Sequence, residues 1–300
     1  MIEIVILSGK GGTGKTSLAA AFAHLSSKRV LCDLDVDAPD LHLLLHPEIE
    51  RRELFVSGNE AKIVTEKCED CGLCAELCRF DAVSKANGLP QIDPIRCEGC
   101  GVCVDFCPAD AIAFPEKECG EWYLSQTRFG AMVHAQLFAG EENSGRLVAL
   151  LRQQARQLAE TMGADWILSD GPPGIGCPVI SSLSGASLAV IVTEPTPSGR
   201  HDLQRVVDLC GHFQVPAGVI VNKADLNPKL TEKIQADSSA SGLTLLGELP
   251  HDPVITRAMV QGQVVTEYDH GEFSEQVRRI WQTIEDVAGV RTAESMSGGR

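Results

Sequence analysis

The stretch that decides the fold reads IEIVILSGKGGTGKTSLAAAFAHL and covers residues 2–25. Residues 2–8 form a short apolar run rich in β-branched side chains, which is typical of a buried parallel strand. A glycine-rich turn follows, and from Ser17 to Ser26 the apolar side chains fall on one face of a helix. The stretch therefore predicts a strand, a tight loop and a helix, in that order.

The rest of the chain repeats this alternation. Short apolar runs recur at 29–32, 166–170, 188–194 and 217–222. Helix-like stretches, for example 144–162 and 200–213, lie between them. Alternating strands and helices predict an α/β fold with a mostly parallel sheet flanked by helices.

The composition narrows the class of protein. The 300 residues are 44% hydrophobic and 22% charged, a balance that suits one large globular domain or two smaller ones. No run of about 18 apolar residues occurs, so we expect no membrane-spanning helix. The net charge of −15 argues against a nucleic-acid partner, because a phosphate backbone requires a basic face. Since no basic segment precedes the first strand, we expect no secretory signal and a cytoplasmic protein.

Residues 9–16 read GKGGTGKT and match the pattern Gly-x4-Gly-Lys-Thr of a phosphate-binding loop. Glycines let backbone N–H groups approach phosphate oxygens, and the helix N-terminus that follows adds positive potential. In such a loop Lys15 reaches the β- and γ-phosphates and the Thr16 hydroxyl binds Mg²⁺. We expect a nucleotide here, held by Gly9, Lys10, Gly11, Gly12, Thr13, Gly14, Lys15, Thr16 and Ser17.

The second lysine, Lys10, makes the loop resemble the deviant phosphate loop of the MinD/ParA/Mrp and nitrogenase-iron-protein superfamily. The resemblance extends over most of the chain outside a cysteine-rich segment. In that family the extra lysine crosses a dimer interface and touches the partner's nucleotide, which implies the same role for Lys10. The resemblance implies a Mg-ATP-dependent homodimer, or a heterodimer with a related ATPase. It also implies slow or partner-stimulated hydrolysis, with Lys10, Lys15 and Asp35 as catalytic residues.

Two acidic segments resemble the switches of that family. DLDVDAPD at 33–40 resembles the first switch, which implies that Asp35 activates the attacking water and that Asp33 lies beside the Mg²⁺ shell. DGPPGIG at 170–176 resembles the second switch, which implies that Asp170 holds Mg²⁺ through water. The expected magnesium residues are therefore Thr16, Asp33 and Asp170.

The motif NKAD at 222–225 is compatible with either adenine or guanine as the nucleotide base. It follows an apolar run and is similar to the guanine-reading NKxD of GTPases. In MinD-like ATPases an asparagine at this strand end reads adenine, and a later proline-containing loop packs on the base. ELPHDPVI at 248–255 resembles that loop, so the resemblance implies ATP with Asn222 and Pro250 at the base. GTP is the alternative.

Eight of the twelve cysteines lie between Cys68 and Cys107, in two runs offset by 29 residues. Structural disulfides are rare in the cytosol, so metal or redox chemistry is the better explanation. Each run has the C-x2-C-x2-C-x3-C spacing of bacterial two-cluster ferredoxins, in which the fourth cysteine of one run binds the other cluster. One [4Fe–4S] cluster is expected on Cys68, Cys71, Cys74 and Cys107, and a second on Cys78, Cys97, Cys100 and Cys103. Zinc is the alternative metal.

The cysteine-rich segment interrupts the strand–helix alternation and predicts a small inserted α+β ferredoxin-like domain. We expect a P-loop ATPase domain in two parts, 1–59 and 119–288, around an insert at 60–118. The last helix, about 272–288, has one apolar stripe and is expected to pack on the core, since its polar face is not basic enough for a membrane anchor. The small polar residues at 289–300 predict a disordered tail.

Four cysteines lie outside the two runs. Cys32 and Cys210 fall in apolar segments and are expected to be core thiols. Cys177 follows Asp170 by seven residues, a distance similar to that of the cluster-ligating cysteine of the nitrogenase iron protein. Cys177, with Cys119, is therefore a speculative interface thiol; two ordinary thiols are the alternative.

Three functions remain open. The favoured one is an ATP-gated electron carrier with an unidentified redox partner, because full four-cysteine ligation makes clusters stable rather than transferable. The alternative is an assembly or scaffold factor for iron–sulfur or other metal centres, with a metalloprotein partner. Spatial positioning of the MinD/ParA kind is less favoured, because the chain is acidic and lacks a basic membrane helix.

Overall fold

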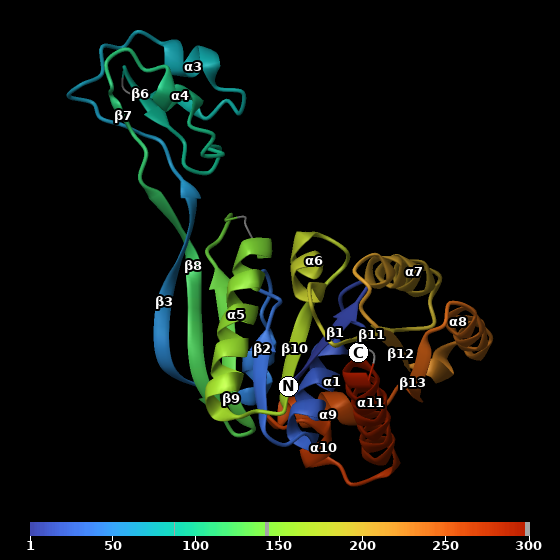
Figure 1. Cartoon of the computed structure of the whole chain (residues 1–300). Coiled ribbons are helices and arrows are strands. Elements are labelled where there is room, and N and C mark those ends of the chain that lie inside the picture. Colours follow the sequence, from blue (N-terminus) through green and yellow to red (C-terminus); the bar gives the residue numbers. More distant parts are fainter. Residues whose placement is uncertain (87, 142–143, 298–300) are drawn as a thin grey trace. The chain divides into compact units, whose positions relative to one another are not determined.

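The computed structural model describes residues 1–86, 88–141 and 144–297 (Figure 1). The chain divides into two compact units. Unit 1 contains Met1–Glu53, Trp122–Gln136 and Ser144–Arg300. Unit 2 contains Leu54–Glu121 and Leu137–Asn143, and so includes the whole of the segment 60–118 that was expected as an insert.

A nine-stranded sheet has the order β13-β12-β11-β1-β10-β2-β9-β8-β3. Its strands are β1 (Ile2–Ser8), β2 (Arg29–Asp33), β3 (Glu48–Asn59), β8 (Glu116–Thr127), β9 (Gly130–Leu137), β10 (Trp166–Pro173), β11 (Leu188–Thr193), β12 (Ala217–Asn222) and β13 (Thr244–Leu249). The six pairings from β13 through β9 are all parallel. The α/β fold with a mostly parallel sheet is therefore confirmed.

The central strands bury both faces, because successive side chains point to opposite sides of a sheet. Ile4 and Ile6 of β1 pack in one core with α1 (Lys15–Leu25), α2 (Leu41–Leu45), α9 (Val254–Val260), α10 (Val265–Tyr268) and α11 (Glu272–Ser297). Val5 and Leu7 pack in a second core with α6 (Cys177–Leu183), α7 (Pro197–His212) and α8 (Pro228–Ala240). Helices thus flank the sheet on both sides (Figure 1), and α5 (Ser144–Met162) contacts β2 and α6.

The last helix differs from its expected length. Phe273, Val277, Ile280, Trp281 and Ile284 are buried in the first core, as the apolar stripe predicted. The helix α11 continues to Ser297, whereas a disordered tail was expected from residue 289. Residues 298–300 of that expected tail lie outside the described residues. No helix within the described part of the chain is long and apolar enough to cross a membrane.

Unit 2 is built from two halves that repeat with the cysteine runs. Its elements between β3 and β8 are β4 (Lys62–Ile63), α3 (Leu73–Leu77), β5 (Val83–Ala86), β6 (Leu89–Ile92), α4 (Val102–Asp105) and β7 (Ile112–Ala113). Strand β4 pairs antiparallel with β7, and β5 pairs antiparallel with β6. Ile63 is opposite Ile112 in one pair, and the residues at the equivalent repeat positions, Ile92 and Val83, are opposite each other in the second. The first strand of each half therefore pairs with the last strand of the other.

Candidate functional site

The loop between β1 and α1 lines a cavity of about 510 Å³ in unit 1. Gly12 and Gly14 take left-handed φ angles of 80° and 90°, a conformation that favours glycine. A Cβ atom on Gly14 would lie 2.5 Å from Nδ2 of Asn222, so a larger residue there would displace the Asn222 amide. The predicted residues that line this cavity are Gly11, Gly12, Thr13, Gly14, Lys15, Thr16, Ser17 and Asp35.

Lys15 and Asp170 form a buried ion pair at this cavity, with Nζ 2.6 Å from Oδ1. Parallel pairing of β1 with β10 places Ile6 opposite Asp170, so the aspartate stands beside the start of the loop. Burial works against the charge on Lys15, but the attraction of Asp170 outweighs it and the pKa of Lys15 is raised. The second oxygen of Asp170, Oδ2, is buried without a hydrogen-bond partner in the described residues. A hard cation such as Mg²⁺ would satisfy that oxygen.

Asp33 is the last residue of β2, and Asp35 follows two residues later. Asp33 is buried, and its two oxygens accept from the backbone N–H groups of Asp35 (3.1 Å) and Leu41 (3.2 Å). Burial, with the nearby charge of Asp170, raises the pKa of Asp33 well above its usual range. Asp35 lines the cavity, and burial raises its pKa to about 6 although Lys15 acts in the opposite direction. Asp35 can therefore change its protonation state only about one pH unit below neutrality.

Lys10 is bound within its own chain. Its Nζ contacts Oε1 of Glu194 and donates to the hydroxyls of Thr196 (3.2 Å) and Ser198 (3.4 Å). Lys223 contacts the other oxygen of Glu194 at 3.1 Å. Burial opposes the charge of Glu194, but its bonds to both lysines outweigh this and lower its pKa. The in-trans role of Lys10 stays a prediction.

The motif 222–225 reaches the phosphate loop. Asn222 is buried, its Nδ2 donates to the Thr13 carbonyl at 2.8 Å, and its Oδ1 accepts from the Lys223 backbone N–H at 3.0 Å. The role of Asn222 at the base stays a prediction. Pro250 follows β13, beside the end of β12. Glu194 and Lys223 were not expected at the site, although both follow apolar strands that end at the same edge of the sheet.

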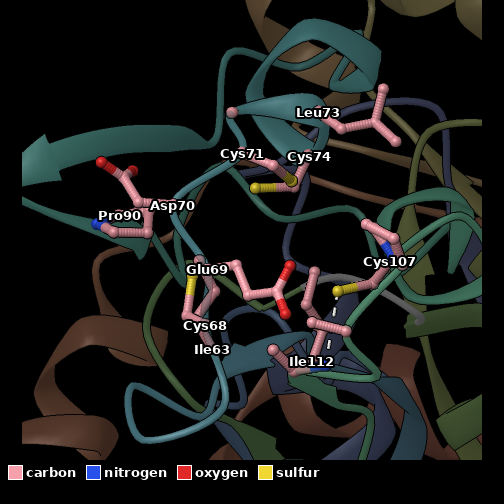
Figure 2. Close-up of a pocket in the computed structure, with 14 residues that line it drawn as sticks. Ile63, Cys68, Glu69, Asp70, Cys71, Leu73, Cys74, Pro90, Cys107 and Ile112 are labelled. Carbon is pink, nitrogen blue, oxygen red and sulfur yellow. Dashed lines mark hydrogen bonds between the residues drawn. The ribbon is translucent and has the colours of Figure 1, made fainter.

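A second cavity, in unit 2, is lined by cysteines from both runs. Figure 2 shows Cys68, Cys71 and Cys74 of the first run and Cys107 of the second around it. Burial raises the pKa of the Cys74 thiol, and the neighbouring Cys68 and Cys71 raise it further. The structure thus brings together the four residues expected for the first cluster.

The second expected set shows the same local features. Burial raises the pKa of Cys103, and Cys97 and Cys100 add to the rise. Cys78 and Cys107 hold equivalent places in the repeat, and their sulfurs accept the backbone N–H groups of Ala82 (3.4 Å) and Ala111 (3.3 Å). Such N–H donors stabilise a thiolate.

No group of three His, Cys, Asp or Glu side chains within residues 1–86, 88–141 and 144–297 is arranged to hold a single metal ion. A zinc ion would draw four ligands to one point at about 2.3 Å, whereas a four-iron cluster takes its thiolates at separate irons around a larger core. The cavity of Figure 2 is lined by four cysteines, three from the first run and one from the second. The clusters themselves stay a prediction.

The remaining four cysteines differ in their surroundings. Cys119 is buried in unit 2, where its thiol donates to the Ser57 carbonyl at 3.2 Å. Cys177 begins α6 in unit 1 and is exposed. Cys32 and Cys210 are buried, as core thiols should be, and burial raises the pKa of Cys210 to about 12. Burial of Cys119 leaves Cys177 as the accessible thiol of the two interface candidates.

Comparisons with known proteins agree with the geometry of unit 1. Residues 4–265 match the model of the CobQ/CobB/MinD/ParA nucleotide binding domain family. An uncharacterized protein of Methanocaldococcus jannaschii is 36% identical over 230 residues, covering 76% of this chain and 80% of that protein. The septum site-determining protein MinD of Synechocystis is 28% identical over 271 residues, covering 87% and 80%. The structure of Pyrococcus horikoshii MinD with Mg-ADP shares the fold, with a TM-score of 0.59, 18% identity and coverage of 96% and 98%.

Proposed function

The chain belongs to the CobQ/CobB/MinD/ParA nucleotide-binding family and is an ATPase, and on that premise we propose that it couples Mg-ATP to electron transfer through two [4Fe–4S] clusters. The observation that carries the proposal is the cavity in unit 2 lined by Cys68, Cys71, Cys74 and Cys107. A bound cluster supplies a one-electron redox centre. The protein's unidentified partners would be a one-electron donor and a one-electron acceptor. We propose a cytoplasmic protein with an ATPase domain in two parts, 1–59 and 119–288, and an iron–sulfur domain at 60–118.

The strand exchange in unit 2 explains why the fourth cysteine of each run would serve the other set. Strand β7 follows Cys107 and pairs with β4, which precedes Cys68. The backbone therefore returns Cys107 to the first run, beside Cys68, Cys71 and Cys74. The equivalent pairing of β5 with β6 returns Cys78 to the run that begins at Cys97. This geometry supports Cys78, Cys97, Cys100 and Cys103 as the second ligand set.

In unit 1 the chain's own residues would bind and orient ATP. Lys15 and the loop N–H groups would hold the β- and γ-phosphates, and Thr16, Asp33 and Asp170 would surround Mg²⁺. Asp35, with a pKa of about 6, is suited to orient water and accept its proton near neutral pH. Lys10 would leave Glu194 and reach the nucleotide of a second subunit. ATP would thus join two subunits, identical or related, and hydrolysis would separate them.

The test is the metal content of protein purified without oxygen. The parent should hold about eight irons and eight labile sulfides per chain, and its reduced form should give a cluster signal in electron paramagnetic resonance. Cys74→Ser should lose one cluster first. Cys177→Ser, at an exposed cysteine outside both runs, should keep the full iron content. Zinc in place of iron, or no metal after anaerobic reconstitution, would contradict electron transfer.

A second candidate is spatial positioning of the MinD kind, which the name of the Synechocystis relative favours. In that function the ATPase cycle would work without a metal in unit 2. Parent protein that lacks iron yet hydrolyses ATP and dimerises normally would favour this candidate. Protein whose iron is released to an apo-metalloprotein, rather than reduced and reoxidised in place, would instead favour the assembly function.

A further inference from the structure

The motif 222–225 divides its contacts between two segments of unit 1. Asn222 donates to the carbonyl of Thr13, and Nζ of Lys223 donates to the carbonyl of Gly12 at 3.1 Å. Both contacts end on the phosphate loop. The first two residues of the motif therefore fix the loop.

Asp225 contacts a different segment. Its Oδ1 accepts the backbone N–H of His251 at 2.5 Å. Strands β12 and β13 pair with Asn222 opposite Leu249, so the residues after each strand leave the sheet side by side. A carboxylate that accepts an N–H forms a charge-assisted hydrogen bond, which is stronger than a neutral one. Asp225 thus ties the segment after β13 to the segment after β12.

The segment that Asp225 fixes continues to the phosphate cavity. Oδ1 of Asp252 accepts the N–H of Val254 at 2.8 Å, at the start of α9. Near the other end of α9, Met259 lines the cavity, and its sulfur lies 3.8 Å from Oγ of Ser17. The segment that begins at Pro250 therefore reaches the cavity through Met259, and Asp225 holds its start at His251.

We propose that Asp225 is a positioning residue for the purine end of this site: it fixes residues 250–259 and does not read the base. The inference rests on the proposed binding of ATP. A guanine reader must turn its carboxylate towards the base, so that it accepts from both the N1–H and the 2-amino group. Here Oδ1 of Asp225 is engaged by His251. The motif NKAD thus holds the phosphate loop and the segment after β13 in place, and does not specify guanine.

The experiment measures binding of ATP, GTP, xanthosine triphosphate and inorganic tripolyphosphate to the full chain by calorimetry with Mg²⁺. The variants are Asp225→Ala, which loses the acceptor, and Asp225→Asn, whose amide oxygen can still accept from His251. Glu232→Ala, which removes an exposed carboxylate from α8, is the matched control for charge. Tripolyphosphate has no base, so it reports the phosphate end alone.

The parent and Glu232→Ala should prefer ATP to GTP. Asp225→Ala should weaken ATP about three- to tenfold, because an exposed charge-assisted bond contributes modestly, and should leave tripolyphosphate unchanged. Asp225→Asn should restore ATP affinity to within about twofold, since the hydrogen bond is retained. If Asp225→Asn gained binding of xanthosine triphosphate, the inference would be overturned. The new amide would then be donating to the 2-oxo group of xanthine, which requires residue 225 to contact the base. Normal ATP affinity in Asp225→Ala would also overturn it. A parent that binds no ATP would contradict the proposed function itself.

Discussion

At the scale of single residues, the acid–base state of Asp35 sets an expected pH dependence. Its folded-state pKa is raised to about 6 by burial, so the protonated form persists up to that pH and the carboxylate predominates above it. If Asp35 accepts a proton from water, the turnover rate should fall as the pH is lowered through about 6. Asp35→Asn should lose about 100-fold or more in turnover and should lose this acid limb. Single-turnover ATP hydrolysis from pH 5 to 8 measures both.

The same residue supplies the folding control. A half-buried carboxylate with a raised pKa favours the fold when protonated, and this stability is lost as the pH rises from the usual value towards 6. At pH 7 the neutral Asp35→Asn should therefore melt at the same or a higher temperature than the parent. If Asp35→Asn were inactive and its melting temperature were much lower than the parent's, the loss of activity would reflect unfolding rather than removal of the catalytic base. Unchanged turnover in a well-folded variant would remove the catalytic role.

Only part of the site could be predicted from the residues. Lys15 and Thr16 lie in a contiguous motif, whose chemistry can be read without knowing the fold. The pair Lys15–Asp170 depends on β10 lying next to β1, which strand spacing in the sequence does not specify. Glu194 binds Lys10 and Lys223 from a third strand end, and a single glutamate after an apolar run carries no local signal.

At the scale of elements, the apolar strands β1, β2, β10, β11 and β12 were predicted, whereas β9, β13 and the long strands β3 and β8 were not. Strand β3 reads EIERRELFVSGN and is mostly exposed, so it offers no apolar run. It is an edge strand of the sheet. The conformation of such a strand depends on pairing with its neighbour more than on the hydrophobic pattern of its own residues. The short helix α2 was missed for a related reason, because five residues are too few to show helical periodicity.

Within unit 2, the end of β3 carries an element-scale prediction. Gly99, in the loop of the second cysteine run, has φ 59°, and a Cβ atom there would lie 2.2 Å from the carbonyl oxygen of Asn59. Gly72, in the first run, has φ 79° and no heavy atom within 4 Å of the same position. Both alanine substitutions carry about 1–2 kcal/mol of left-handed strain, and Gly99→Ala adds a backbone clash of about 1–3 kcal/mol.

Limited proteolysis compares the two variants. Gly99→Ala should be cut within residues 54–121 much faster than the parent, and Gly72→Ala only slightly faster, since proteases cleave the locally opened chain. Equal protection of the two variants would show that the loop moves away from Asn59 without loss of structure. Cleavage within residues 144–297 serves as the internal reference for unit 1.

At the scale of the whole molecule, net charge opposes self-association. Each chain carries −15, so two copies repel one another at low ionic strength. A dimer therefore requires local attraction that exceeds this repulsion, and a lysine that meets the partner's triphosphate supplies it. Salt at about 0.15 M limits the repulsion to a Debye length of about 8 Å, so moderate salt should strengthen an ATP-dependent dimer rather than weaken it.

The whole-molecule prediction concerns Lys10, which is held by Glu194 in the single chain. Since Lys15 and the loop N–H groups are intact, Lys10→Ala should bind ATP as a monomer. It should fail to dimerise and should hydrolyse ATP about 100-fold or more slowly, because a cation supplied in trans stabilises the charge of the transition state. Asp35→Asn should accumulate as a dimer with Mg-ATP, since hydrolysis is what separates the subunits. Light scattering of the parent and both variants, with and without Mg-ATP, measures the mass. A parent protein that hydrolyses ATP at its full rate while remaining monomeric would contradict the in-trans role. Lys10 would then serve only as the ion-pair partner of Glu194 within its own chain.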